Sequence, residues 1–131
     1  MNENEFVRAF EDCTLPAGSF HHADHVRLAW LYLRDRTFPA ALEAFCSGLE
    51  RFATANGKPG LYHETITWFY LLLIHERRAR LAPDHTWEDF ASANADLLNW
   101  KEPILKKYYR DQTLKSDFAR RVFVLPDRGL L

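Results

Sequence analysis

Three of the six histidines in this chain lie close together, at positions 21, 22 and 25, directly before residues 26–33, which are apolar except for Arg27. If a helix begins here, His22 and His25 are three residues apart and His21 and His25 are four apart, so either pair can present two imidazoles on one side of the helix. The three rings cannot all face one point. We expect His22 and His25 to be the pair that binds a divalent metal ion, with His21 on the flank.

A second group of polar side chains, His63, Glu64 and Thr67, lies at the start of another long apolar stretch. His63 and Glu64 add a nitrogen and a carboxylate, and the full set with His22 and His25 suits zinc, iron, manganese or nickel. A hydroxyl at Thr67, four residues after His63, could orient the imidazole. We expect Glu64 to be a fourth ligand or a general base, and an open position on the metal to activate water or to bind a small substrate.

Two other interpretations fit the same residues. In one, the protein binds no metal and the histidines and Arg27 hydrogen-bond a small anion, because an arginine in an apolar helix should either pair with a carboxylate such as Glu64 or reach an anionic ligand. In the other, the protein has a structural or interaction role, in which His63 caps a helix and Glu64 favours the positive end of the helix dipole. Arg120 is either a guanidinium group held against aromatic side chains to bind a ligand or a solvent-facing cation.

Several enzyme classes lack their motif in this sequence. It has no nucleophile elbow, phosphate-binding loop, dinucleotide-binding glycine fingerprint or cysteine–histidine dyad. The histidine spacing also differs from that of the zinc metalloproteases, in which a glutamate directly follows the first histidine of the motif. Cys13 and Cys46 have no metal-ligand spacing, and we expect both to be reduced. Whether the protein is an enzyme stays open.

The composition favours one folded domain over residues 1–131. Apolar residues make up 47% of the chain and aromatic residues 15%, which is enough hydrophobic surface to form a core. The net charge of -1 argues against a nucleic-acid partner, although the chain from Lys101 onward carries eight basic and four acidic residues. The first residues are polar and no apolar run reaches the length of a membrane span, so we expect a cytoplasmic protein whose partner is a small molecule.

The hydrophobic periodicity predicts that helices position these groups. Apolar residues recur at helical spacing, with cap and break signals between them, over about 5–13, 21–36, 37–56, 61–81, 86–93, 95–100 and 103–109, with a last turn capped by Thr113. Residues 122–127 are apolar and β-like but have no second strand to pair with, so we expect an extended C-terminal arm. The predicted fold is an all-α, single-domain helical bundle of about five to seven helices.

Three segments resemble the motifs of a family of small, functionally uncharacterised bacterial helical proteins. The segments are Phe20-x-His22-x-x-His25-Val26-Arg27-Leu28-Ala29-Trp30, Tyr62-His63-Glu64-Thr65-Ile66-Thr67 and Ala119-Arg120-x-x-Phe123-Val124-x-Pro126-Asp127. The resemblance covers most of the chain and implies that the three segments form one site, but the family has no established activity to transfer. A looser resemblance to His/Asp metal-dependent phosphohydrolases fails, because their second motif is a paired His-Asp and His63-Glu64 stands here instead.

Overall fold

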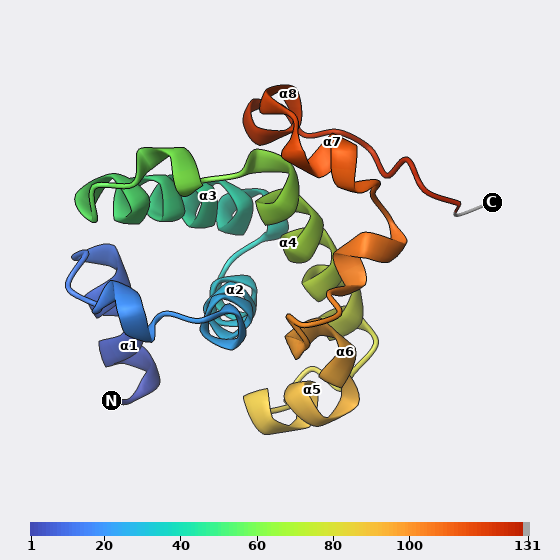
Figure 1. The fold of residues 1–131 in the computed structure, drawn as a ribbon. Helices are drawn as coiled ribbons and strands as arrows, with labels where there is room; N and C mark the ends of the chain where they lie inside the picture. Colours follow the sequence, from blue (N-terminus) through green and yellow to red (C-terminus); the bar gives the residue numbers. More distant parts are fainter. Residues whose placement is uncertain (130–131) are drawn as a thin grey trace. The chain divides into compact units, whose positions relative to one another are not determined.

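The computed structural model describes residues 1–129 (Figure 1). This part of the chain forms eight α-helices, five of which are seven residues or longer, and no strand. The prediction of an all-α protein is therefore confirmed. The chain divides into two compact units, Met1–Tyr62 (unit 1) and His63–Leu131 (unit 2). That the whole chain folds as one domain stays a prediction.

Unit 1 contains three α-helices and two 3₁₀ turns: α1 (Glu3–Glu11), Ala17–Ser19, α2 (His22–Asp35), α3 (Phe38–Ala55) and Pro59–Leu61. Local signals in the sequence set the helix ends. Asn2 caps α1 through reciprocal hydrogen bonds with Glu5, of 2.8 and 3.2 Å. Pro39 occupies the first turn of α3, where its missing N–H costs nothing. Gly57 follows the end of α3 with a φ of 73°, a conformation that glycine adopts without strain.

Aromatic rings form much of the core of unit 1. The Phe10 ring is fully buried, and its centroid lies 5.7 Å from those of both Phe20 and Phe52. Tyr32 meets the same ring edge-on, with the centroids 6.3 Å apart. The helix α2 buries every residue from Leu28 to Leu33, as expected for a helix that is apolar on nearly all sides. Such close packing leaves the Phe10 ring little room to move.

Gly48, in the middle of α3, leaves space for Phe10. A Cβ atom at this position would lie 2.7 and 2.9 Å from two atoms of the Phe10 ring, which is closer than carbon atoms normally approach. Alanine is favoured over glycine inside a helix by about 1 kcal/mol, but forcing an extra methyl group into a packed core costs roughly 1–3 kcal/mol. We expect Gly48→Ala to lower the free energy of unfolding by about 1 kcal/mol in urea denaturation.

The matched control for this substitution is Gly18→Ala, because a Cβ atom at Gly18 meets nothing within 4 Å. We expect this control to leave stability almost unchanged. If Gly48→Ala instead stabilises the protein, the Phe10 ring can move aside and the core of unit 1 is less tightly packed than these distances indicate.

Unit 2 contains five α-helices and one 3₁₀ turn: α4 (Glu64–Ala79), α5 (Trp87–Ala93), α6 (Ala95–Leu98), Ile104–Lys107, α7 (Asp111–Lys115) and α8 (Asp117–Arg121). Thr86 caps α5 through reciprocal hydrogen bonds with Asp89, of 3.1 and 3.0 Å. Arg77 joins α4 to α6, because its guanidinium group binds the two carboxylate oxygens of Asp96 at 3.0 and 2.9 Å. The same group also donates to the side-chain oxygen of Asn94 at 2.8 Å.

The structure differs from the predicted helices in several places, including α1, which spans Glu3–Glu11 and not residues 5–13, and α7, which was not predicted. α4 begins at Glu64 instead of near residue 61, because His63 caps it and residues 59–61 form a separate turn. The segment after Pro103 forms a 3₁₀ turn, Ile104–Lys107, and does not continue as a helix to residue 109. Ser116, and not Thr113, caps α8, because the Ser116 hydroxyl accepts a hydrogen bond from the Ala119 N–H at 3.1 Å.

The predicted extended arm is confirmed. Residues 122–127, called the C-terminal arm below, form neither helix nor strand and follow α8 (Figure 1). Within unit 2, α8 packs against α4. Trp68 of α4 stacks on Phe123 of the arm with ring centroids 5.2 Å apart, and the Tyr109 hydroxyl donates to the Val124 carbonyl at 2.6 Å. These contacts tie the arm to α4 and to the segment before α7.

Both cysteines, Cys13 and Cys46, are half-buried free thiols, as predicted. Nowhere in residues 1–129 is there a helix with both the length and the apolar character that crossing a lipid bilayer requires.

Candidate functional site

The three neighbouring histidines lie at the beginning of α2. His21 is the residue before the helix, and its backbone N–H donates to the carboxylate of Asp24 at 3.0 Å. Asp24 therefore helps to start the helix. His22 becomes the first helical residue and His25 follows one turn later, as their spacing predicted.

His25 is held against Phe20. The two rings are stacked, with centroids 3.9 Å apart and planes inclined by 21°, and the imidazole hydrogen-bonds the Phe20 backbone. Burial, followed by the charge of the neighbouring His22, lowers the pKa of His25 to about 4. His25 is therefore neutral at pH 7, which is the form in which an imidazole binds a metal or accepts a hydrogen bond.

Arg27 has an incomplete set of partners. Its guanidinium carbon lies 5.8 Å from the centroid of the Phe6 ring, in a cation–π contact. Its Nε atom is buried and has no hydrogen-bond partner in the described part of the chain, and Arg27 forms no ion pair with a carboxylate of unit 1. The Phe6 ring in turn lies 6.4 Å from the Phe20 ring. Arg27, Phe6, Phe20 and His25 thus form a continuous row of contacts, called the aromatic row below.

His63 caps α4 and uses both of its ring nitrogens. Its Nδ1 atom accepts a hydrogen bond from the Ile66 N–H at 3.2 Å, so the proton is on Nε2, which donates to the Leu114 carbonyl at 2.7 Å. Burial lowers the pKa of His63, and the charge of Arg120 acts in the same direction. In this arrangement His63 has no nitrogen left for a metal ion, and it performs the capping role that was the alternative to metal binding.

Glu64 and Thr67 complete the beginning of α4. Glu64 is the first helical residue, where a negative charge is favourable against the positive end of the helix dipole. The Thr67 hydroxyl donates to the backbone carbonyl of His63 at 2.8 Å and not to the imidazole. The expected support of the His63 ring by Thr67 is therefore replaced by a hydrogen bond from the Thr67 side chain to the helix backbone.

Thr65 is the residue of this region that the sequence did not single out. Its side chain is fully buried, and its hydroxyl oxygen lies 2.7 Å from the Ala119 carbonyl oxygen and 2.9 Å from that of Val122. The same oxygen accepts a hydrogen bond from the Val124 N–H at 3.1 Å. One hydroxyl group therefore joins the first turn of α4 to the end of α8 and to the C-terminal arm. In the sequence, only its position inside the segment 62–67 pointed to a role for Thr65. Its hydrogen-bond partners lie 54 to 59 residues away, beyond the reach of local sequence patterns.

The carboxylate of Asp127 holds the far end of the C-terminal arm. It accepts hydrogen bonds from the Thr113 hydroxyl and, at 2.9 Å, from the Arg110 N–H, and these two bonds lower the pKa of Asp127. The backbone N–H groups of Asp127 and Arg128 both donate to the Tyr108 carbonyl at 3.0 Å. Asp127 therefore fixes the position of the arm.

Arg120 and its neighbour Arg121 differ in their surroundings. Arg121 forms an ion pair with Asp117 at 2.8 Å, whereas Arg120 lies close enough to His63 for its charge to affect that imidazole. Two of the three segments in the resemblance, those around His63 and Arg120, therefore come together in unit 2. The third segment, with His22 and its neighbours, belongs to unit 1.

The predicted metal ligands are divided between the units, with His22 and His25 in unit 1 and His63 and Glu64 in unit 2. Within residues 1–129, no group of three or more His, Cys, Asp or Glu side chains is arranged to hold a metal ion.

The beginning of α2 and the beginning of α4 differ in what they can do chemically. At α4, the polar groups of His63, Thr65 and Thr67 are used in hydrogen bonds that organise unit 2. At α2, a neutral imidazole at His25 and an incompletely bonded guanidinium group at Arg27 lie on one aromatic row. The beginning of α2 is therefore the better candidate for a binding site. No protein-family model, curated protein or solved structure matches this chain.

Proposed function

We propose that the protein is a binding module for a small anion, which binds at α2 through the guanidinium group of Arg27. The observation that carries this proposal is the buried Nε atom of Arg27, which has no hydrogen-bond partner in the described residues. A buried donor without an acceptor costs about 1–3 kcal/mol, and the penalty is larger for a charged group. Proteins rarely keep such a group unless a ligand, ion or water completes it.

The chemistry of Arg27 points to the class of ligand. A guanidinium group has a planar fork of N–H donors that matches the oxygens of a carboxylate or a phosphate. The contact with Phe6 partly compensates the positive charge but supplies no acceptor for the Nε–H. Because His25 is neutral at pH 7, Arg27 supplies the positive charge of the aromatic row. The aromatic row also favours an anion that carries an apolar or aromatic part.

Arg27→Met tests this proposal through two opposite effects. Methionine keeps the apolar stem and removes the unsatisfied donor, so we expect the ligand-free protein to become more stable by about 1 kcal/mol. A ligand that binds only the folded protein at one hundred times its dissociation constant adds about 2.7 kcal/mol. We expect a thermal-shift screen with phosphate, sulfate, acetate and benzoate to raise the Tm of the parent protein, and to leave the Tm of Arg27→Met unchanged.

Arg8→Gln is the matched control, because Arg8 is an exposed arginine of the same unit. It should keep the full response to the anion. The proposal is wrong if no anion of the screen stabilises the parent protein, or if Arg27→Met and the parent respond alike.

A second candidate function is the binding of a divalent metal ion, zinc, iron, manganese or nickel, by His22 and His25. It is favoured by His25, which is neutral and hydrogen-bonded to the Phe20 backbone, as metal-bound histidines usually are through their second nitrogen. His22 lies one turn before it on α2. For His63 to act as a metal ligand, its ring would have to release the Ile66 N–H or the Leu114 carbonyl.

Elemental analysis tests the second candidate. Protein purified without a histidine tag and incubated with each of the four metals should retain one equivalent after gel filtration, and the double variant His22→Ala, His25→Ala should retain none. His63→Ala should retain the metal, because both ring nitrogens of His63 are used in hydrogen bonds within unit 2. Absence of bound metal in the parent protein after reconstitution with all four ions would exclude this function.

A further inference from the structure

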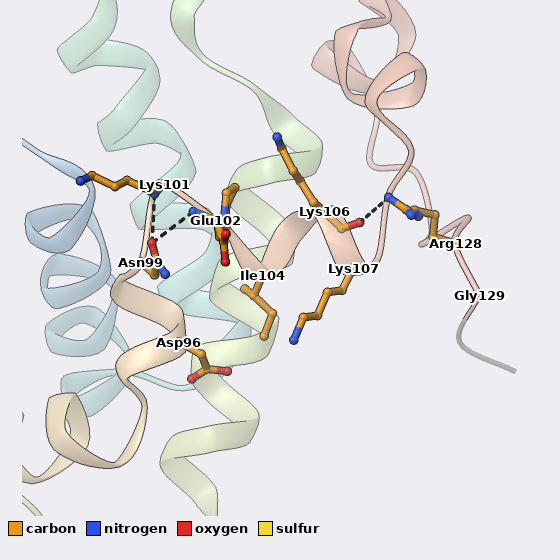
Figure 2. A pocket seen from close by; sticks show the side chains of 10 residues that line it. Asp96, Asn99, Lys101, Glu102, Ile104, Lys106, Lys107, Arg128 and Gly129 are labelled. Atoms are coloured by element: carbon orange, nitrogen blue, oxygen red, sulfur yellow. Dashed lines mark hydrogen bonds between the residues drawn. The ribbon is translucent and has the colours of Figure 1, made fainter.

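Unit 2 carries a surface pocket of about 630 Å³ that is unrelated to the histidines (Figure 2). It lies beside the Ile104–Lys107 turn, between the segment that follows α6 and the residues directly after the C-terminal arm. Its volume is within the range of pockets that bind small molecules. The pocket therefore has room for a ligand of substantial size.

Four of the residues that line the pocket are cations: Lys101, Lys106, Lys107 and Arg128. Two carboxylates, Asp96 and Glu102, also line it, but Asp96 is already neutralised by the two-point ion pair with Arg77 at 3.0 and 2.9 Å. In the described residues, none of the three lysines forms an ion pair. The pocket therefore has a clear excess of positive charge, and it accounts for half of the basic residues after position 100.

The backbone around the pocket is held in place by hydrogen bonds, whereas the lysine side chains form no ion pair in the described residues. The Asn99 side-chain oxygen accepts hydrogen bonds from the N–H groups of Lys101 and Glu102 at 3.0 and 3.2 Å, which fixes the turn after α6. Arg128 donates to the Lys106 carbonyl at 3.0 Å, which joins the two sides of the pocket. The lysine side chains extend in different directions (Figure 2), and long flexible chains of this kind can turn toward a bound anion.

We propose that this pocket binds a small polyanion that contains at least two linked phosphate groups. Several separated cations are not satisfied by a monoanion, whereas a chain of phosphates can contact three or four ammonium and guanidinium groups at once. The exposed position of the lysines means that each contact is weak and sensitive to salt. The site is independent of Arg27, which is one half-buried arginine with a buried Nε atom in unit 1 and suits a smaller anion.

Titration calorimetry with inorganic tripolyphosphate at low ionic strength tests the proposal on the full chain. We expect binding to the parent protein that is much tighter than that of orthophosphate. The double variant Lys106→Gln, Lys107→Gln should bind about tenfold more weakly, because each exposed charge contact is worth roughly a factor of three. Glu102→Gln should bind more tightly, since it removes the one carboxylate of the pocket that has no cation paired with it in the described residues.

The matched control is Lys58→Gln, Lys115→Gln, which changes the net charge by the same amount at two exposed lysines outside the pocket. It should keep the parent affinity, and so should Arg27→Met. Equal weakening by the control pair would show that tripolyphosphate responds only to net charge, and absence of binding to the parent protein would equally overturn the proposal. Either result would leave the anion proposal for Arg27 untouched, because that proposal is tested with different anions and a different variant.

Discussion

Acidification from pH 7 to pH 4 is expected to lower the free energy of unfolding of the metal-free protein by up to about 3 kcal/mol through His25 alone. In the folded protein the pKa of His25 is lowered from 6.5 to about 4, chiefly by burial. Between pH 6.5 and about pH 4, the His25 side chain is protonated in the unfolded chain but not in the folded protein, so acid favours unfolding. The stabilisation is complete above about pH 6.5 and is lost as the pH falls toward 4. The lowered pKa of His63 acts in the same direction.

Urea denaturation across this pH range, on protein treated with a chelator, measures the effect, and an NMR titration of the His25 ring measures its pKa directly. His25→Phe is the matched variant, because phenylalanine can stack on Phe20 without titrating. The carboxylates of Asp96 and Asp127, whose pKa values are lowered by their hydrogen bonds, contribute equally in both proteins. The difference between the two pH profiles therefore isolates His25. Identical profiles would mean that His25 is solvated and titrates near its ordinary pKa.

Thr65→Val is expected to destabilise unit 2 by about 3 kcal/mol and to release the C-terminal arm, because at least two buried or part-buried backbone groups lose their partner at once. Valine keeps the shape of the side chain but neither donates to the Ala119 or Val122 carbonyl nor accepts from the Val124 N–H. The stability change is measured by urea denaturation. Hydrogen exchange of the Val124 amide should accelerate strongly, since that group loses its acceptor.

Two further variants test whether the loss of stability is specific to the Thr65 hydroxyl or follows from any substitution in the first turn of α4. Thr67→Val should cost much less, roughly 0.5–1 kcal/mol, because the Thr67 hydroxyl only adds a bond to a carbonyl that already accepts from the backbone of the same helix. Thr65→Ser should retain most of the stability, since it restores the hydroxyl. If Thr65→Val and Thr67→Val have equal effects, the hydroxyl of Thr65 does not hold the arm.

The parts of the fold that were predictable from the sequence are those set by local contacts. Thr86 and Asp89 cap α5 within a single turn, and Pro39 and Gly57 mark the two ends of α3 in the way their backbone restrictions require. The arm was predictable because residues 122–127 look like a strand without a partner. Each of these signals acts over a few residues, which is the range over which spacing in a sequence carries structural information.

The chemistry of the histidines was less predictable because it depends on distant backbone atoms. The spacing of His22 and His25 correctly placed them one turn apart, but it could not show that His25 would stack on Phe20 and stay neutral. The sequence also could not show that the second ring nitrogen of His63 donates a hydrogen bond to the Leu114 carbonyl, 51 residues away. The basic surplus after residue 100 was visible in the sequence, whereas its gathering around a pocket depends on how the chain turns after α6.

The bonds of Thr65 also bear on the order in which the chain folds during synthesis. The aromatic core of unit 1 lies entirely within residues 1–62, so it can form while the rest of the chain is still being made. The first turn of α4 is synthesised early as well, but its buried hydroxyl and imidazole find their acceptors only when residues 114–124 have emerged from the ribosome. Until then, the side of α4 that packs against α8 and Phe123 lacks its cover. Unit 2 should therefore be the slower unit to fold, and the one that depends more on chaperones.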